Sequence, residues 1–226
     1  MFKLLLLIMT VLIISKAVNT LSVYEQSLIV DCHNIYRSQV AYGKAKNSTG
    51  FLPKGKNIKE IIYCKDLEEI AEKWNCSGGN NEDYGENAYG FEELPVPNAL
   101  PFHRNLIGQY VSLSCGSKLR FSKTLRFLLA AVLLKACNTW AESCKYGVAE
   151  DLEYDSAHSR SGACTQMIWA ETFKIGCAFI KCPIYNYLVC RYSPRGNNPG
   201  ELIYQKGSVC TECGDKGCSY TYGLCL

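Results

Sequence analysis

Fourteen cysteines in a chain of 226 residues restrict the folds open to this sequence more than any other feature. In an oxidising compartment such cysteines form disulfides, and each native bridge typically adds about 2–4 kcal/mol to stability. In a reducing compartment the same residues would instead suggest metal sites or catalytic thiols. The compartment in which the chain folds therefore decides what the cysteines do.

The first residues indicate that compartment. Lys3 precedes an uncharged apolar run over 4–14, which is followed by small residues at Ser15 and Ala17. This order is typical of a secretory signal peptide, so we expect residues 1–17 to be removed, with an uncleaved anchor as the alternative. The run is shorter than the roughly 18–20 residues of a spanning helix, and no later segment reaches that length. We therefore expect a secreted, extracellular protein without a transmembrane segment.

Net charge argues against one class of partner. The formal net charge of +3 includes Lys3 and Lys16, so the mature chain carries about +1. Such a chain has no overall excess of positive charge for nucleic-acid binding, and we expect no nucleic-acid partner. The 209 residues left after cleavage are enough for one domain with a small appendage.

Apolar periodicity predicts helices in the first two thirds of the chain. Apolar residues recur at three- and four-residue spacing over 24–41, 64–74 and 125–145. Polar residues fill the opposite face of the first of these segments. Residues 43–58 are polar and rich in Gly, Lys and Asn, and we expect a loop there.

Further along the chain the pattern changes to that of strands. Residues 165–169, 175–180 and 187–192 are short runs rich in β-branched and aromatic residues, bounded by Gly, Pro or Asn. Helices first and strands later indicate the α+β class.

The C-terminal residues contain four closely spaced cysteines. In a reducing compartment their spacing would suggest a zinc knuckle, but secretion favours bridging. About 30 residues with almost no aliphatic core need two disulfides, or docking on the main domain, to stay folded. Three pairings are possible, and the sequence does not choose among them. The four residues are Cys210, Cys213, Cys218 and Cys225.

Two sequons fit the exposed loops of a secreted glycoprotein. They begin at Asn47 and Asn75. The second contains Cys76, which competes for modification if it is already bridged. We therefore predict glycosylation at Asn47 alone.

Four motifs occur in an order that resembles one known family. They are His33-Asn34-x-x-Arg37, Tyr84-Gly85-Glu86-Asn87, Gly162 to Trp169, and Tyr187 to Asn197. Together they resemble the CAP superfamily of cysteine-rich secretory, antigen 5 and pathogenesis-related proteins, also called the SCP domain. The cysteine-rich end most resembles secreted venom-allergen-like proteins of parasitic nematodes.

The resemblance implies a fold and a division of the chain. The expected fold is a three-layer α-β-α sandwich with a central antiparallel sheet, and a small disulfide-rich tail. The domain would span 18–200 and the tail 201–226. Within the domain, 101–134 is an atypical insertion, because it holds five basic and no acidic residues and lengthens the connection before Glu142. We expect part of it to be a retained intron or a gene-model error, with a genuine long loop as the alternative.

The resemblance also implies a cleft lined by Glu86, Glu142, Ala163 and Gln166. Members that bind metal there use two glutamates and two histidines, and Glu86 and Glu142 match the glutamates. Ala163 stands at one histidine position, and 77–83 holds no histidine for the other. Zinc favours nitrogen and sulfur donors, so we predict no metal and no cofactor. The chain's histidines are His33, expected in packing, His103, and His158, a remote candidate ligand.

We predict a non-enzymatic protein. Cys164 is better explained as a disulfide member than as a nucleophile, and Glu86 with Glu142 as a glycosidase pair has little support from the resemblance. The expected function is binding to an unknown extracellular protein or lipid, with host immune modulation as the implied role. The alternative is a lipid or sterol carrier, although residues 145–154 are acidic and sparsely aromatic where such a role needs aromatic side chains.

Overall fold

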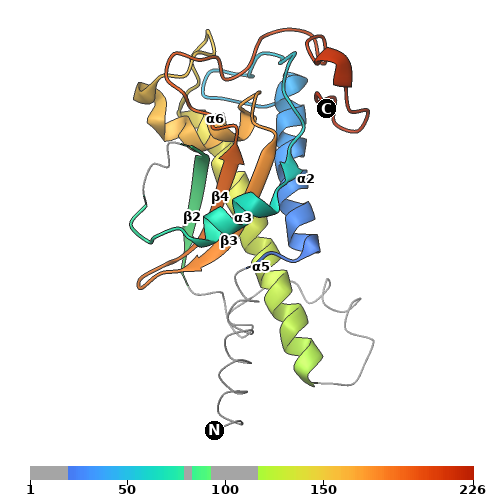
Figure 1. The fold of residues 1–226 in the computed structure, drawn as a ribbon. Helices are drawn as coiled ribbons and strands as arrows, with labels where there is room; N and C mark the ends of the chain where they lie inside the picture. The colour runs from blue at the N-terminus through green and yellow to red at the C-terminus, as the bar shows by residue number, and fades with distance from the viewer. Residues whose placement is uncertain (1–19, 79–82, 93–116) are drawn as a thin grey trace.

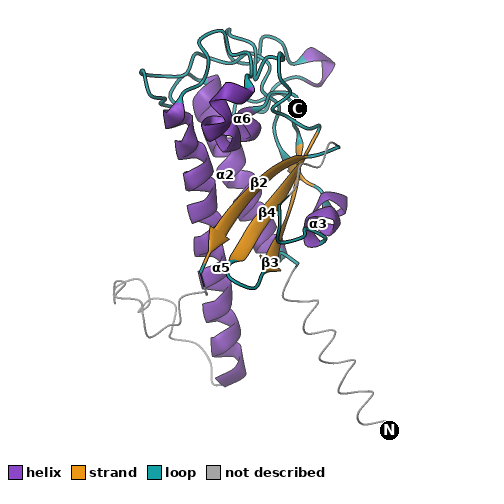
Figure 2. Ribbon diagram, turned by 90° about the vertical axis from the view of Figure 1, so that its left-hand side faces the viewer, coloured by secondary structure: helices purple, strands orange, loops and turns teal. Residues whose placement is uncertain are grey.

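A computed structural model describes residues 20–78, 83–92 and 117–226 of the chain. In this part, a sheet of four strands lies between two layers of helices (Figure 1; Figure 2), which is the predicted α-β-α sandwich. Helix α3 (Lys65–Glu72) lies on one side of the sheet, and α2, α5 and α6 lie on the other. The strands, in spatial order, are β1 (Ile62–Tyr63), β3 (Lys174–Lys181), β4 (Asn186–Ser193) and β2 (Gly85–Phe91).

The remaining helices occupy the other layer and the connections. The α-helices are α2 (Val23–Ala41), α5 (Ser117–Glu142) and α6 (Gly162–Ile168). The short 3₁₀ helices are η2 (Ser143–Tyr146), η3 (Ser156–Ser161) and η4 (Gly214–Lys216). None of the helices in the described ranges combines the length and hydropathy of a membrane-spanning segment.

The sheet is antiparallel except at one edge. β4 pairs antiparallel with both β3 and β2, in agreement with the predicted antiparallel sheet, whereas the two-residue β1 pairs parallel with β3. A Cβ atom at Gly176 would lie 2.2 Å from the Glu68 nitrogen, so only glycine lets α3 lie directly on β3. The larger core cluster lies on the other face, where Ile29, Leu133 and Met167 are completely buried.

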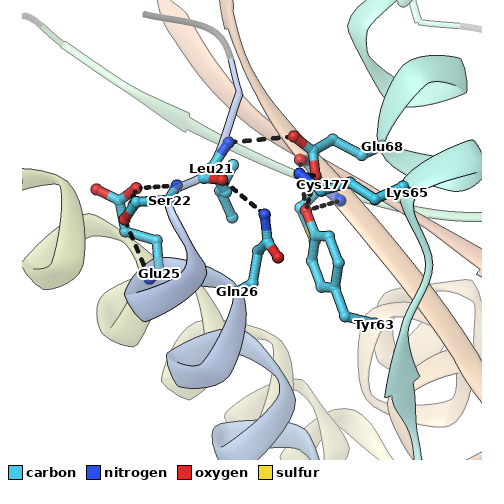
Figure 3. Close-up of polar contacts among 8 residues, drawn as sticks. All are labelled: Leu21, Ser22, Glu25, Gln26, Tyr63, Lys65, Glu68 and Cys177. Atoms are coloured by element: carbon cyan, nitrogen blue, oxygen red, sulfur yellow. Dashed lines mark hydrogen bonds and ion pairs between the residues drawn. The ribbon is translucent and has the colours of Figure 1, made fainter. Parts of the chain in front are cut away.

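The N-terminal end of α2 is fixed by side-chain hydrogen bonds (Figure 3). Ser22 caps the helix, because its backbone nitrogen donates to Glu25 Oε2 at 2.7 Å and its hydroxyl accepts from the Glu25 nitrogen. One residue earlier, the Leu21 nitrogen donates to Glu68 Oε1 at 3.2 Å. Glu68 is buried and also accepts from Tyr63 and Lys65, so it joins the start of the domain to α3.

The predicted helices are confirmed, but the prediction for 165–169 is wrong. These residues lie in α6 and the residue after it, not in a strand. Local β propensity is overridden by long-range bonds: Asn197 accepts from Thr165 and donates to the Gly162 carbonyl, and Cys164 is bridged to Cys144.

Strand β2 was not predicted, because Gly85, Asn87 and Gly90 are poor strand formers. Its register with β4 imposes the extended conformation, with Glu86 opposite Arg191. A signal that depends on a partner 105 positions away in the sequence is absent from any local window.

Helix α5 begins before the predicted residue 125 and runs through the end of the range proposed as an insertion. Leu128, Ala130 and Leu133 are buried in the core, so this part of the segment has the burial site that its apolar residues require. Phe127 is 70% exposed. Residues 101–116 lie outside the described part of the chain. That 101–134 is an atypical insertion therefore stays a prediction.

Twelve cysteines form six disulfides. They join α2 to α5, the residues after α3 to the β3–β4 turn, η2 to α6, and β3 to β4, and two more close the tail. Cys64 is unpaired among the described residues, and Cys115 lies outside them. The pairs are Cys32–Cys137, Cys76–Cys182, Cys144–Cys164, Cys177–Cys190, Cys210–Cys218 and Cys213–Cys225.

The tail is held both by its disulfides and by docking. Cys225 exchanges backbone hydrogen bonds with Ile58 and Glu60, and Leu224 is 1% exposed. Ser38 on α2 donates to the Tyr222 carbonyl at 2.5 Å. The two mechanisms that the sequence left open therefore act together.

The Arg37 guanidinium is completely buried and bonds only to backbone carbonyls. Nε donates to Lys59, Nη1 to Met167 and Trp169, and Nη2 to Ala170 and Thr172. The distances lie between 2.7 and 3.3 Å. Burial lowers the pKa of Arg37 to about 9, so the group remains charged at neutral pH. Arg37 thus joins α2 to the end of α6 and to the residues that precede β1 and β3.

His33 lies in a second buried network. Its Nδ1 donates to the Ile29 carbonyl at 2.7 Å, and its Nε2 lies 2.9 Å from the Tyr192 hydroxyl, which also accepts from Asn87 at 3.1 Å. Burial, opposed in part by the Ile29 hydrogen bond, lowers the pKa of His33 to about 4. The imidazole is therefore neutral in the folded protein at physiological pH.

We predict that Arg37→Lys lowers the free energy of unfolding by about 3–5 kcal/mol. A lysine has three donors for five carbonyls and lacks the planar fork, so buried acceptors are left unpaired. Urea unfolding with the disulfides intact measures the change. Arg160→Lys, at an exposed position, is the control and should shift stability by less than about 0.5 kcal/mol. A loss below 1 kcal/mol for Arg37→Lys would contradict the assigned role.

Acid should destabilise the protein through His33. The unfolded state binds the proton near pH 6.5 and the folded state only near pH 4, so the contribution is complete above pH 6.5 and is lost as pH falls to 4. The difference corresponds to about 3 kcal/mol. Urea unfolding at several pH values should show a steeper acid loss for the wild-type protein than for His33→Gln. Equal slopes would exclude this origin.

Candidate functional site

The four residues expected to line a cleft come from three elements. Glu86 is the second residue of β2, Glu142 is the last residue of α5, and Ala163 and Gln166 lie in α6. Their surroundings differ. Glu142 is exposed, Ala163 is half-buried, and Gln166 is only 1% exposed.

Glu86 faces the α3 side of the sheet. Its Oε2 lies 2.7 Å from Arg191 Nη1 and accepts from Trp74 Nε1 at 3.1 Å. The Arg191 side chain is 7% exposed and that of Glu86 22% exposed, so the ion pair is largely withdrawn from solvent. The carboxylate is thus already neutralised by an internal cation.

The next residue of β2 points to the opposite face. Asn87 Nδ2 donates to the Ala163 carbonyl at 3.0 Å and to the Tyr192 hydroxyl. Trp140 on α5 approaches the same strand, with its Nε1 3.4 Å from the Ala88 carbonyl. The structure therefore brings α5, α6 and β2 together through Asn87 and Trp140. It places Glu86 on the other side of the sheet from the layer that carries Glu142.

The buried side chain of Gln166 lies between Gly85 and Gly196. Its Oε1 accepts from the Gly196 nitrogen at 3.1 Å, and its Nε2 donates to the Thr172 hydroxyl at 3.2 Å. A Cβ atom at Gly85 would lie 2.1 Å from Gln166 Oε1, which only glycine avoids. The amide fixes the start of β2 against the Pro194 to Asn197 turn and does not face solvent.

The donor set does not fit zinc. Ala163 offers no ligand, Glu86 is paired with Arg191, and both ring nitrogens of His33 are engaged. The Sγ atoms of Cys32 and Cys137 lie within 4.8 Å of a His33 nitrogen, but the two sulfurs form a disulfide. His158 lies in η3, and His103 lies outside the described residues.

A shallow pocket of about 410 Å³ is lined by Ala149, Asp151, Glu153, Tyr154, Asp155, Pro199 and Gly200. Three carboxylates, those of Asp151, Glu153 and Asp155, stand on its wall beside Tyr154. An acidic wall of this kind suits polar or cationic groups better than an apolar sterol.

The predicted glycosylation site lies in a tight turn. Asn47 Oδ1 accepts from the Thr49 nitrogen and hydroxyl, and Ser48 and Thr49 are exposed. The position is accessible, and modification of Asn47 stays a prediction.

Sequence comparison relates the chain to secreted proteins and venom allergens. Ancylostoma secreted protein of Ancylostoma caninum is 28% identical over 196 residues, which cover 85% of this chain and 42% of that protein. Venom allergen 5 of Lycosa singoriensis is 25% identical over 205 residues, or 84% of this chain and 46% of that protein. The chain thus spans less than half the length of these two relatives. Venom allergen 5.02 of Dolichovespula maculata is 27% identical over 190 residues, covering 80% of this chain and 77% of that protein.

Solved structures share the fold. NaASP2 with Zn²⁺ matches at a TM-score of 0.69 and 27% identity, over 91% of this chain and 97% of that one. BmVAL-1 matches at 0.67 and 28% identity, over 91% and 95%. The profile of the CAP family, described as the cysteine-rich secretory protein family, matches residues 30–192. That match covers more than half of the chain, and the protein belongs to the CAP family.

Proposed function

We propose that this CAP protein is secreted and acts without catalysis, by binding extracellular targets, with modulation of host immunity as its role. One observation carries the proposal: Glu86 and His33, the two residues of the family motifs best suited to metal or acid–base chemistry, are committed to internal contacts. Glu86 is held by Arg191 and Trp74, and His33 by Ile29 and Tyr192. Relatives named as a secreted protein and as venom allergens support the extracellular setting.

The arrangement of carboxylates and thiols argues against hydrolysis. A glycosidase needs two carboxylates that flank one bond, and Glu86 and Glu142 come from opposite sides of the sheet. Cys164 is bridged to Cys144 and has no free thiol to act as a nucleophile. The binding surface must therefore be sought on the outside of the sandwich.

We predict that Glu86→Gln destabilises the protein by about 2 kcal/mol and does not change its binding of zinc, which we expect to be weak or absent. The substitution leaves the Arg191 charge buried without its partner. Glu142→Gln, at an exposed helix end, is the matched control and should be nearly neutral. Thermal unfolding and zinc titration calorimetry measure both properties. Sub-micromolar zinc binding that Glu86→Gln abolishes would show that the carboxylate is a metal ligand instead.

The proposed function is tested by binding of the purified, fluorescently labelled glycoprotein to leukocytes. We expect saturable binding that excess unlabelled protein displaces, while reduced and alkylated protein does not bind because the disulfides hold the surface in shape. In parallel, organic extraction and mass spectrometry determine co-purified lipid. Absence of saturable binding together with one equivalent of a bound lipid would replace the proposal with the carrier function.

A further inference from the structure

Residues 43–54 form an irregular hairpin beside the C-terminal tail. The backbones of Lys46 and Phe51 form an isolated antiparallel β-bridge, and the Leu52 nitrogen donates to the Ala45 carbonyl at 2.8 Å. Ala45 and Leu52 are 3% and 2% exposed, so their side chains fix the hairpin to the domain. The residues on either side of these two therefore project outward.

Three lysines of the hairpin are exposed and have no acidic partner. Lys44, Lys46 and Lys54 form no ion pair among the described residues. The two lysines that follow are different, because Lys56 pairs with Glu212 at 3.3 Å and Lys59 with Glu171 at 2.6 Å. The sequence has no Asp or Glu between Asp31 and Glu60, so no acidic residue of this segment offsets the three charges.

Two exposed aromatic rings hold ammonium groups in place. Lys44 Nζ lies 5.4 Å from the centroid of the Tyr42 ring, and Lys46 Nζ lies 5.8 Å from that of Phe51. The rings are 44% and 61% exposed. Cation–π contact restricts the lysines without neutralising them, which lowers the entropy that binding must overcome. We call Tyr42, Lys44, Lys46, Phe51 and Lys54 the lysine patch.

The neighbouring elements add further charge of both signs. Lys206 is exposed and pairs through its backbone with Gly55, and its ammonium contacts the Glu150 carbonyl. Glu212, from the tail, is bound to Lys56. The patch is therefore a local concentration of positive charge on a chain whose formal net charge is only +3.

We propose that the lysine patch binds a linear sulfated polysaccharide, an inference that rests on the proposed extracellular function. Lys44 and Lys46 flank the buried Ala45, and both are exposed, so they can contact successive anionic groups of an extended chain. A membrane fits less well, because two single rings, each with an ammonium group beside it, offer little apolar surface for insertion. A glycan on Asn47, at the tip of the same hairpin, would also keep a bilayer away while leaving a flexible chain access.

Heparin affinity tests the proposal on the full glycosylated protein. We expect the wild-type protein to be retained on immobilised heparin at about 0.15 M salt. Replacing the three lysines (K44Q, K46Q, K54Q) should weaken the affinity about a hundredfold, since each lysine beside an anionic surface contributes about fivefold. The control carries the same charge change at exposed lysines elsewhere (K73Q, K145Q, K181Q) and should bind like the wild-type protein. Thermal unfolding checks that both variants fold, and single replacements Lys44→Gln and Lys46→Gln provide the answer if the triple variant does not.

Each contrary result overturns the proposal. Equal losses in the two triple variants would indicate a general charge effect, and no retention of the wild-type protein would exclude the site. Retention on N-acetylated, desulfated heparin at the same strength would exclude recognition of sulfate. Binding to vesicles of phosphatidylcholine and phosphatidylserine, lost in the patch variant and without heparin binding, would assign the patch to lipid. Leukocyte binding by a wild-type protein that immobilised heparin does not retain would leave the proposed function intact and refute only this partner.

Discussion

The burial of Arg37 is the constraint on which the rest of the structure depends. Its five donors reach carbonyls that lie 22 to 135 positions away in the sequence. One of these is the Met167 carbonyl in the last turn of α6, which has no hydrogen-bond partner inside that helix. Arg37 therefore caps the C-terminal end of α6 and also holds it against α2. A buried cation without an ion pair is tolerated only if all of its donors are satisfied. The fold therefore cannot shift α2 against α6 or β3 without breaking several hydrogen bonds at once.

Disulfides strengthen this frame by joining its elements covalently. Cys32–Cys137 joins α2 to α5 across 105 positions, and Cys144–Cys164 joins η2 to α6. The long separation matters because a bridge stabilises mainly by restricting the unfolded chain. In the tail the crossed bridges close short loops, and docking on Ile58 and Glu60 holds the tail to the domain. Disulfides thus join segments that are distant in the sequence within the domain, and close short loops in the tail.

Helices and the last two strands could be predicted because their apolar periods are local. The function of Arg37 could not, although its motif was visible, because its five acceptors are assembled only by the fold. The same holds for Asn34, whose amide takes the place of a neighbouring strand by bonding both backbone groups of Ile61. Glu86 and Glu142 were expected together from a resemblance, whereas strand alternation sends Glu86 and Asn87 to opposite faces. The spacing of two residues along a strand decides whether their side chains share a face. Which face of the sheet each side chain occupies follows only from the register of β2 with β4.

The contacts of Glu86 commit its carboxylate to packing inside the protein. With Arg191 as an internal counterion, the carboxylate stabilises the packing of Trp74 and Tyr187, whose rings lie 5.1 Å apart beside α3. A site committed to packing can no longer take up a metal without loss of stability, because Arg191 would be left buried and uncompensated. Variation that creates new partners must then fall on segments whose side chains are free, such as the 43–54 hairpin and the 149–155 loop. Both segments adjoin the tail or the residues that lead to it, so the disulfide-closed end of the chain also sets the shape of the surface that these two segments form.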